Sequence, residues 1–371
     1  MKIHPVNTQK SLRQFIRFPY QFYADDPMWV APLRSEARGQ FNIRKNPFLE
    51  HCRYQLFLLK DNGRVIGRIA AFIDTLANEF WGEETGLFGY YECPDDPQAS
   101  NLLLETAANW LAGQGMKTMR GPWSFVSQEW GAVVEGFSPP PIIMAPYNPP
   151  YFISQFNDYG LEKIKDLIVY VIDARESYQI PERILTLTDR VSERFGVRTR
   201  PLDMDDFAGD VASFVALSNE SLANNWGYAP VTEAEAAAMA ADLKDILHPN
   251  AVIFAEDRDG RPIGFGIALP DVNQLLKGMN GRLLPFGWLK LLRGLPKLTH
   301  YRMFALGVLP EYHGKAIDSL IYRALYESVF TPDLRMEINY VLEDNGPMNN
   351  AIMKLGAKPL RRYRIFEKAL S

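Results

Sequence analysis

The amino-acid sequence predicts an α/β protein made of two tandem halves, each a mixed β-sheet flanked by helices. Apolar runs of strand length alternate with amphipathic stretches of helix length, which is typical of sheets covered by helices. The same order of elements occurs twice with a period of about 190 residues, and such a period indicates duplicated domains rather than a solenoid. A chain of 371 residues also suits two domains better than one.

The first half, residues 1–175, is expected to begin with a strand and an amphipathic helix and then to form a hairpin. Its expected strands cover residues 2–6, 54–60, 65–73, 86–91, 116–121 and 167–172. Its expected helices cover residues 12–22, 97–111 and 151–159. Asp61-Asn62-Gly63 separates the two hairpin strands, because this turn sequence accepts the positive φ angles that a tight hairpin needs.

Residues 176–196 are expected to form a connecting helix, since their apolar residues repeat at helical spacing. The second half, residues 197–371, then repeats the order of the first. Its expected strands cover residues 197–202, 251–256, 262–269, 304–309, 336–342 and 363–367. Its expected helices begin at the acidic cluster of residues 203–206, near residue 315 and at residue 347.

Composition excludes several classes of protein. The formal net charge of −4 argues against general attraction to nucleic acid. Cys52 and Cys93 are too few for a disulfide framework, and the histidines form no cluster, so we expect no metal site. The sequence has no signal-peptide core and no apolar run near the ~20 residues that cross a bilayer, so we expect a cytoplasmic protein.

Residues 304–325 combine a strand, a loop that reads VLPEYHGKAID at residues 308–318, and a helix. Backbone N–H groups at a helix start carry partial positive charge and can hold a pyrophosphate where no side chain blocks the approach. This segment resembles the cofactor-binding motif of the GNAT superfamily of acyl-CoA N-acyltransferases. The resemblance implies two GNAT-like domains in tandem and acyl-CoA as co-substrate. It assigns cofactor binding to Val308, His313, Gly314, Lys315 and Ala316.

The loop also departs from the family pattern. His313 stands where the family usually has arginine or glutamine, and Ala316 stands where it has glycine. Asp318 replaces a small neutral residue, and a carboxylate near a helix N-terminus would repel a pyrophosphate. The alternative to a cofactor loop is therefore a helix capped by its own aspartate, with no ligand.

The later family motif of strand, asparagine, helix and glycine resembles residues 341–357. The resemblance implies that Asn345 contacts the cofactor, whereas Ile352 occupies the position of a tyrosine that often protonates the leaving thiolate. In the first half the matching loop, residues 92–99, has no glycine, and Asp96-Pro97 forms a self-sufficient helix start. We therefore expect that loop to be degenerate.

The tandem layout is similar to that of the bacterial ceramide synthases, which join a long-chain acyl group to a sphingoid amine. Gly121-Pro122 and the segment NNWGY at residues 224–228 carry this closer resemblance. Asparagine side chains can bind an amine or a hydroxyl. The candidate substrate-binding residues are Asn224, Asn225, Trp226, Tyr228 and Asn273. The plain alternative for residues 224–228 is an ordinary turn.

A polar and aromatic cluster follows the first-half strand that ends at residue 121. It consists of Trp123, Ser124, Gln128, Glu129 and Trp130. It could face the substrate cleft or pack at a domain interface.

Residues 270–303 form an insertion that is both basic and apolar. Between residues 272 and 310 there are lysines and arginines but no aspartate or glutamate, although the whole chain is acidic. Such a segment, here residues 275–298, can lie peripherally on an anionic membrane or cover an acyl chain. It could equally be a packed insertion whose polar face is basic.

Attack of an amine on a thioester needs a base that removes the ammonium proton. The leading candidates are Glu337 and Glu343, which alternate with Asn339 along one face of the expected strand and its end. Glu256 and His313 are further candidates by residue type.

Three functions remain open from the sequence. The leading one is an acyl-CoA-dependent N-acyltransferase that acts on a lipid-like amine, with a long acyl chain favoured by the insertion. The second is a non-catalytic binding or regulatory protein on a degenerate GNAT scaffold, and the third is an aminoacyl-tRNA-dependent transferase. The acidic net charge disfavours the third.

Overall fold

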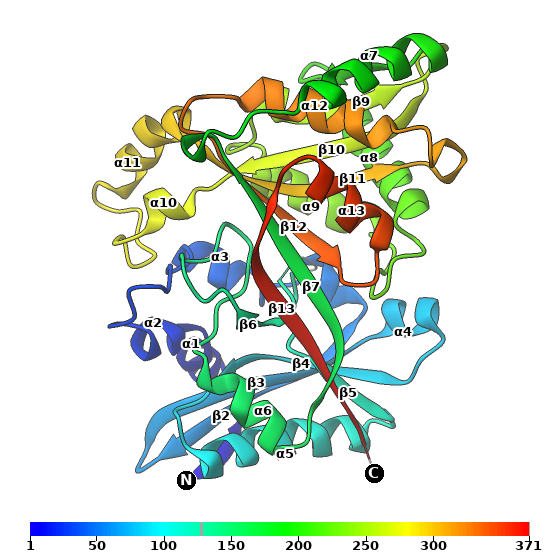
Figure 1. The fold of residues 1–371 in the computed structure, drawn as a ribbon. Coiled ribbons are helices and arrows are strands. Elements are labelled where there is room, and N and C mark those ends of the chain that lie inside the picture. Colours follow the sequence, from blue (N-terminus) through cyan, green and yellow to red (C-terminus); the bar gives the residue numbers. More distant parts are fainter. Residues whose placement is uncertain (127–128, 371) are drawn as a thin grey trace. The chain divides into compact units, whose positions relative to one another are not determined.

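The computed structural model describes residues 1–126 and 129–370, which form two compact units (Figure 1). Unit 1 contains Met1–Leu167 and Leu276–Gly287 together with the residues from Arg361 onward. Unit 2 contains Ile168–Leu275 and Trp288–Leu360. Strands β7 (Glu162–Asp173) and β13 (Lys358–Ala369) therefore contribute residues to both units.

The sheet of unit 1 has the strand order β1-β2-β3-β4-β5-β13, and β6 also pairs with β13. The strands are β1 (Lys2–Pro5), β2 (Cys52–Asp61), β3 (Arg64–Asp74), β4 (Thr85–Glu92), β5 (Thr118–Gly121), β6 (Ala132–Glu135) and β13 (Lys358–Ala369). The predicted β2–β3 hairpin is confirmed, and its turn residues Asn62 and Gly63 have φ angles of 47° and 79°. Strand β13 is longer than the predicted strand at residues 363–367 and lies beside β5, with Phe366 opposite Gly121.

The helices of unit 1 are α1 (Gln9–Arg17), α2 (Pro19–Phe22), α3 (Arg34–Gly39), α4 (Thr75–Trp81), α5 (Pro97–Gly113) and α6 (Tyr151–Asp158). The expected start of α5 is confirmed, because the Asp96 side chain accepts from the N–H groups of Gln98 and Ala99. The single helix expected at residues 12–22 was wrong. Pro19 has no N–H to continue α1, so the chain ends that helix and begins α2.

The sheet of unit 2 has the strand order β12-β11-β10-β9-β8. These strands are β8 (Arg198–Pro201), β9 (Val252–Glu256), β10 (Pro262–Pro270), β11 (His300–Val308) and β12 (Arg335–Leu342). The helices are α7 (Glu182–Phe195), α8 (Phe207–Ser221), α9 (Glu233–Leu243), α10 (Asn273–Leu276), α11 (Gly287–Gly294), α12 (Ile317–Val329) and α13 (Gly346–Lys354).

Helix α12 packs closely on β10. A Cβ atom on Gly266 would lie 2.4 Å from Ile321 and 2.8 Å from Leu325, both of which are buried. Only glycine therefore allows this approach, and the packing fixes where the N-terminus of α12 lies.

The expected insertion at residues 270–303 contains α10 and α11 but also the beginning of β11. Strand β11 starts at His300 rather than at residue 304, because residues 300–303 pair with β12 and residues 301–303 with β10. None of the described helices has both the length and the apolar character needed to span a bilayer.

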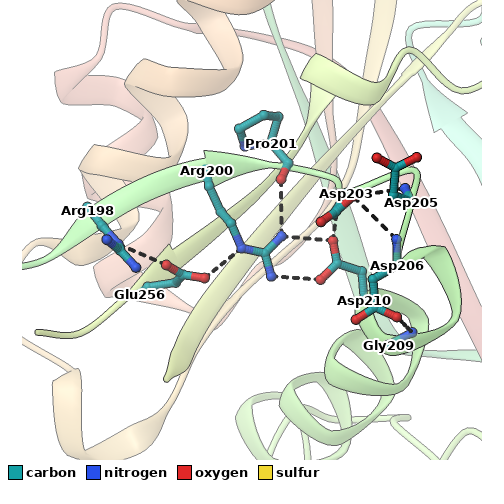
Figure 2. Close-up of polar contacts among 9 residues, drawn as sticks. All are labelled: Arg198, Arg200, Pro201, Asp203, Asp205, Asp206, Gly209, Asp210 and Glu256. Atoms are coloured by element: carbon teal, nitrogen blue, oxygen red, sulfur yellow. Dashed lines mark hydrogen bonds and ion pairs between the residues drawn. The ribbon is translucent and has the colours of Figure 1, made fainter. Parts of the chain in front are cut away.

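Charged side chains join β8 and β9 to the start of α8 (Figure 2). The Nε group of Arg200 donates to Glu256 at 2.6 Å, and its two terminal nitrogens donate to Asp210 at 2.7 and 2.8 Å. Arg198 donates to the other oxygen of Glu256 at 2.9 Å. Burial alone would raise the pKa of Asp210, but hydrogen bonds from Arg200 and from the Asp203 N–H hold that pKa below its usual range. Glu256, an acid–base candidate by residue type, thus belongs to an ion-pair network.

Candidate functional site

Strands β11 and β12 pair only over their first residues. The parallel register runs from His300 opposite Arg335 to Met303 opposite Ile338. Strand β11 nevertheless continues to pair with β10 as far as Val308, while β12 continues to Leu342. Beyond this point the main-chain N–H and C=O groups of β11 and β12 no longer hydrogen-bond to each other, so they can bond to a ligand that lies between the strands.

The loop after β11 leads directly into helix α12. A Cβ atom on Gly314, which has a φ angle of +75°, would meet nothing within 4 Å, so the space beside this residue is open. The Nε2 atom of His313 lies 2.9 Å from the Val308 carbonyl oxygen, and the ring therefore fastens the loop to the strand. The Lys315 ammonium lies 4.4 Å from the Tyr312 ring centroid, which keeps a positive charge beside the loop.

The first turn of α12 has no conventional cap. Ala316 precedes the helix with a φ angle of +58° and offers no side-chain acceptor. Burial raises the pKa of Asp318, while the N–H groups of Ser319 and Asp318 itself and the charge of His313 act in the opposite direction. The Asp318 carboxylate thus faces amide groups at the helix start, where a phosphate would compete with it.

Three polar side chains are buried where the two strands part. Arg302 lies directly opposite Glu337 in the parallel register, and they are 0% and 4% exposed. The Arg302 guanidinium is 5.0 Å from the ring centroid of Tyr340. Asn339 follows the last paired residue, and within the described parts of the chain neither polar atom of its buried side chain has a hydrogen-bond partner. A buried amide of this kind is suited to a bound water or substrate.

The two carboxylate candidates have different surroundings. Glu337 is buried within β12, and one of its oxygens lies 3.8 Å from a terminal nitrogen of Arg335. Glu343 lies beyond the end of β12 and is half-buried. The structure therefore brings Glu337, but not the side chain of Glu343, into the strand segment next to Asn339.

The region after β12 contains a structural residue, Asn349, that the sequence analysis did not single out. Asn345 caps α13 by accepting from the Met348 N–H at 3.2 Å. Asn349 donates to the carbonyl oxygens of Leu342 and Asn345, each at 2.9 Å, and accepts from the Tyr170 hydroxyl at 2.7 Å. Asn349 thereby fixes the end of β12, and its spacing of one helical turn from Asn345 could have indicated this.

Position 352 holds a buried isoleucine, 3% exposed, on α13. It provides no proton donor there.

The candidate acceptor loop, residues 224–228, connects α8 to α9. The Tyr228 hydroxyl donates to the side-chain oxygen of Asn219. The Asn219 side chain also donates to the Val231 carbonyl oxygen and accepts from the Val231 N–H. Tyr228 therefore shapes the loop. Asn224 and Asn225 are exposed, and Trp226 is half-buried.

The start of this loop is close to β11. A Cβ atom on Gly307 would lie 2.3 Å from the Ser221 hydroxyl oxygen at the end of α8. Gly307 belongs to the part of β11 that has left β12, so the loop begins beside the candidate site. Asn273 is half-buried at the start of α10, where its N–H bonds to the Asp271 side chain at 3.3 Å.

The polar and aromatic cluster of unit 1 is mostly packed locally. The Ser124 hydroxyl donates to the Val126 carbonyl at 2.9 Å, and the Trp123 and Trp130 ring centroids are 4.5 Å apart. Gln128 lies outside the described residues. Within the described residues, no group of three or more histidine, cysteine, aspartate or glutamate side chains could hold a metal ion.

Comparisons with known proteins bear on the fold and the family of the chain. No protein-family model matches the sequence. Protein YghO of Escherichia coli (strain K12) is 34% identical over 370 residues, which cover 98% of this chain and 94% of that protein. A bacterial ceramide synthase of Caulobacter vibrioides (strain NA1000 / CB15N) is 33% identical over 382 residues, which cover 100% of this chain and 98% of that protein.

A solved structure, a tandem GNAT protein from the clavulanic acid biosynthesis pathway, has a TM-score of 0.60 and 13% identity. The match covers 100% of this chain and 98% of that one. At such low identity the similarity shows the fold alone, and it confirms the predicted tandem GNAT architecture. Together with the two full-length relatives, it shows that the chain belongs to the family of tandem GNAT-fold proteins that includes the bacterial ceramide synthase of Caulobacter vibrioides.

Proposed function

We propose that this protein is an acyl-CoA-dependent N-acyltransferase that joins a long-chain acyl group to a long-chain amine such as a sphingoid base. The observation that carries the proposal is the parting of β11 from β12 beside the open loop at Gly314. The family and the name of the 33% identical relative support an acyl-transfer reaction.

The donor would be held by main-chain groups. The N–H groups of Gly314 and Ala316 and the Lys315 ammonium suit the phosphates, while the Lys315 N–H donates within the loop to the Tyr312 carbonyl oxygen at 3.3 Å. Main-chain groups of β11 beyond Met303 can bond to an amide-bearing arm and polarise the thioester carbonyl. Asn345 is a further candidate contact, although its side-chain oxygen already caps α13.

The amine would approach from the loop at residues 224–228, with Asn224, Asn225 and Trp226 as candidate contacts. In the reaction the amine nitrogen forms a bond to the thioester carbon, the carbon–sulfur bond breaks, and the thiolate takes up a proton. Glu337 would accept the ammonium proton, with Asn339 orienting the nitrogen. The nitrogen loses a second proton as the amide forms, and because Ile352 supplies no acid, this proton would reach the thiolate through water.

The direct test incubates the full-length protein with sphinganine and palmitoyl-CoA and follows the amide by mass spectrometry and the free thiol by absorbance. We expect both products in equal amounts. Gly314→Glu should abolish them, because the new carboxylate fills the open space at the phosphate loop. Gly115→Glu is the matched control, since Gly115 also has a positive φ angle and nothing within 4 Å of its Cβ position.

A binding experiment separates the remaining alternatives. Ligands that bind the folded state raise its apparent stability, so CoA, acetyl-CoA and palmitoyl-CoA are compared by thermal shift and calorimetry. Stabilisation by palmitoyl-CoA that Gly314→Glu removes supports the proposal. If none of the three binds, the non-catalytic binding protein becomes the better explanation, which the position of Asp318 would favour.

A further inference from the structure

The segment of residues 277–297, here named the basic apolar segment, exposes large apolar side chains to solvent. Leu284, Phe286 and Leu292 are 77%, 75% and 62% exposed, more than any other large apolar side chain among the described residues. Trp288 is 48% exposed. Exposure of this kind at neighbouring positions indicates an interaction surface.

The same segment is strongly cationic. Its Lys277, Arg282, Lys290, Arg293 and Lys297 are all exposed. No aspartate or glutamate occurs from residue 272 to residue 310, although the whole chain has a net charge of −4. The local charge thus has the opposite sign to that of the protein.

The basic apolar segment is held at both ends. The Arg34 N–H donates to the Gly281 carbonyl at 3.0 Å, and a Cβ atom on Gly281 would lie 2.4 Å from the Pro32 carbonyl oxygen. A Cβ atom on Gly294 would lie 2.5 Å from the Leu275 side chain. The exposed side chains therefore belong to a stretch of chain with packed ends.

Helix α11 within this segment has apolar residues on more than one side. Trp288 and Leu292 are one turn apart and exposed on the same side, while Leu289 and Leu291 are half-buried. Trp288 and Leu292 thus present apolar surface to solvent on a side of the helix other than the one with the half-buried leucines.

We infer that the basic apolar segment binds the surface of a bilayer that contains anionic lipid. Tryptophan, phenylalanine and leucine enter the boundary between headgroups and acyl chains, while lysine and arginine attract anionic headgroups. Both the apolar and the cationic side chains that this requires are present here. Aromatic side chains and cations could also serve a nucleic acid, but the exposed Leu284 and Leu292 suit a lipid surface better. The inference does not depend on the proposed function, since lipid binding requires no acyl transfer.

The test is co-sedimentation of the full-length protein with phosphatidylcholine vesicles that contain or lack phosphatidylglycerol. We expect binding to the anionic vesicles that weakens with added salt. Phe286→Ser combined with Trp288→Ser should weaken it roughly tenfold or more through lost apolar burial. Lys290→Glu combined with Arg293→Glu should weaken it by a similar factor and remove the preference for phosphatidylglycerol.

The matched control combines Ile43→Ser with Phe330→Ser, which removes exposed apolar surface elsewhere and should leave binding unchanged. Circular dichroism and thermal unfolding check that every variant is folded. Absence of binding to anionic vesicles, or equal binding by the native protein and both double variants, would overturn the inference. Dimers that disappear in Phe286→Ser/Trp288→Ser, without vesicle binding, would assign the surface to a second copy of the chain instead.

Discussion

Replacing Arg200 by alanine should destabilise unit 2 by a predictable amount. The change removes the only guanidinium that joins Glu256 to Asp210 among the described residues. The side chains of these two carboxylates are 7% and 5% exposed, so each would lose a charged partner away from water.

The size of the effect follows from burial. Removing one partner of a buried ion pair costs about 3–5 kcal/mol. Arg200 is 30% exposed, so water can reach part of the vacated space, and we expect the lower value of about 3 kcal/mol. Arg198 bonds to the same Glu256 but is 71% exposed. Arg198→Ala should therefore cost less than about 1 kcal/mol.

The assay is denaturant and thermal unfolding of both variants, with separate transitions fitted if the two units unfold independently. At roughly 2–4 °C per kcal/mol, Arg200→Ala should lower the Tm of unit 2 by about 6–12 °C. The pKa of Asp210 is low in the native protein, so its stabilisation is present above the unfolded pKa of about 3.9 and is lost as the pH falls through the lower folded value.

Without Arg200 the Asp203 N–H still donates to Asp210, but the hydrogen bonds and the charge of Arg200 are lost, so burial should raise the folded pKa of Asp210. The difference in stability between native protein and variant should then narrow as the pH falls from 7 towards about 4. Equal losses from Arg200→Ala and Arg198→Ala, or a difference that does not change with pH, would refute this reasoning.

Three further predictions concern the site and its surroundings. Glu337→Gln should lower the kcat of amide formation by roughly a hundredfold with little change in KM, whereas Glu343→Gln should leave both near native values. If steady-state kinetics show the larger loss of kcat in Glu343→Gln, the base is Glu343 instead. Asp318→Asn should tighten CoA binding roughly tenfold by calorimetry, because it removes one negative charge beside the phosphates. Since burial raises the pKa of Asp318, native binding should strengthen as the pH falls towards that pKa, and the variant should lack this trend. Hydrogen bonds from Arg175 hold the pKa of Asp173 at about 2. About 2 kcal/mol of folding stability should therefore be present above pH ~4 and be lost as the pH falls towards 2. Unfolding measured as a function of pH should show that Asp173→Asn abolishes this acid dependence.

The sequence predicted the elements whose signals are local. The turn at Asn62-Gly63 and the start of α5 at Asp96-Pro97 each depend on a few adjacent residues, and both are confirmed. The helix after the loop at residues 308–316 follows in the same way from its apolar spacing. The signal that ends α1, Pro19, is equally local. A single helix was nevertheless predicted, because the amphipathic pattern extends over both sides of Pro19.

The rest of the site depends on pairing between distant residues. The sequence places Arg302 among the basic residues of the expected insertion. Its pairing with Glu337 in the register of β11 and β12 shows instead that Arg302 is a buried residue of β11. The strand start at His300 was missed for the same reason. Asn339 was predicted to share a face with Glu337, but the isolation of its amide depends on where β11 leaves β12, which no single segment encodes.

The position of β13 bears on how the protein is made. Its residues from Arg361 onward belong to unit 1, where Phe366 pairs opposite Gly121, although all of unit 2 lies between these positions in the sequence. A ribosome therefore has to synthesise unit 2 before β5 can acquire this neighbour. Nascent unit 1 should remain incomplete during most of translation, and a nonsense mutation shortly before residue 361 should damage the half of the protein that was translated first.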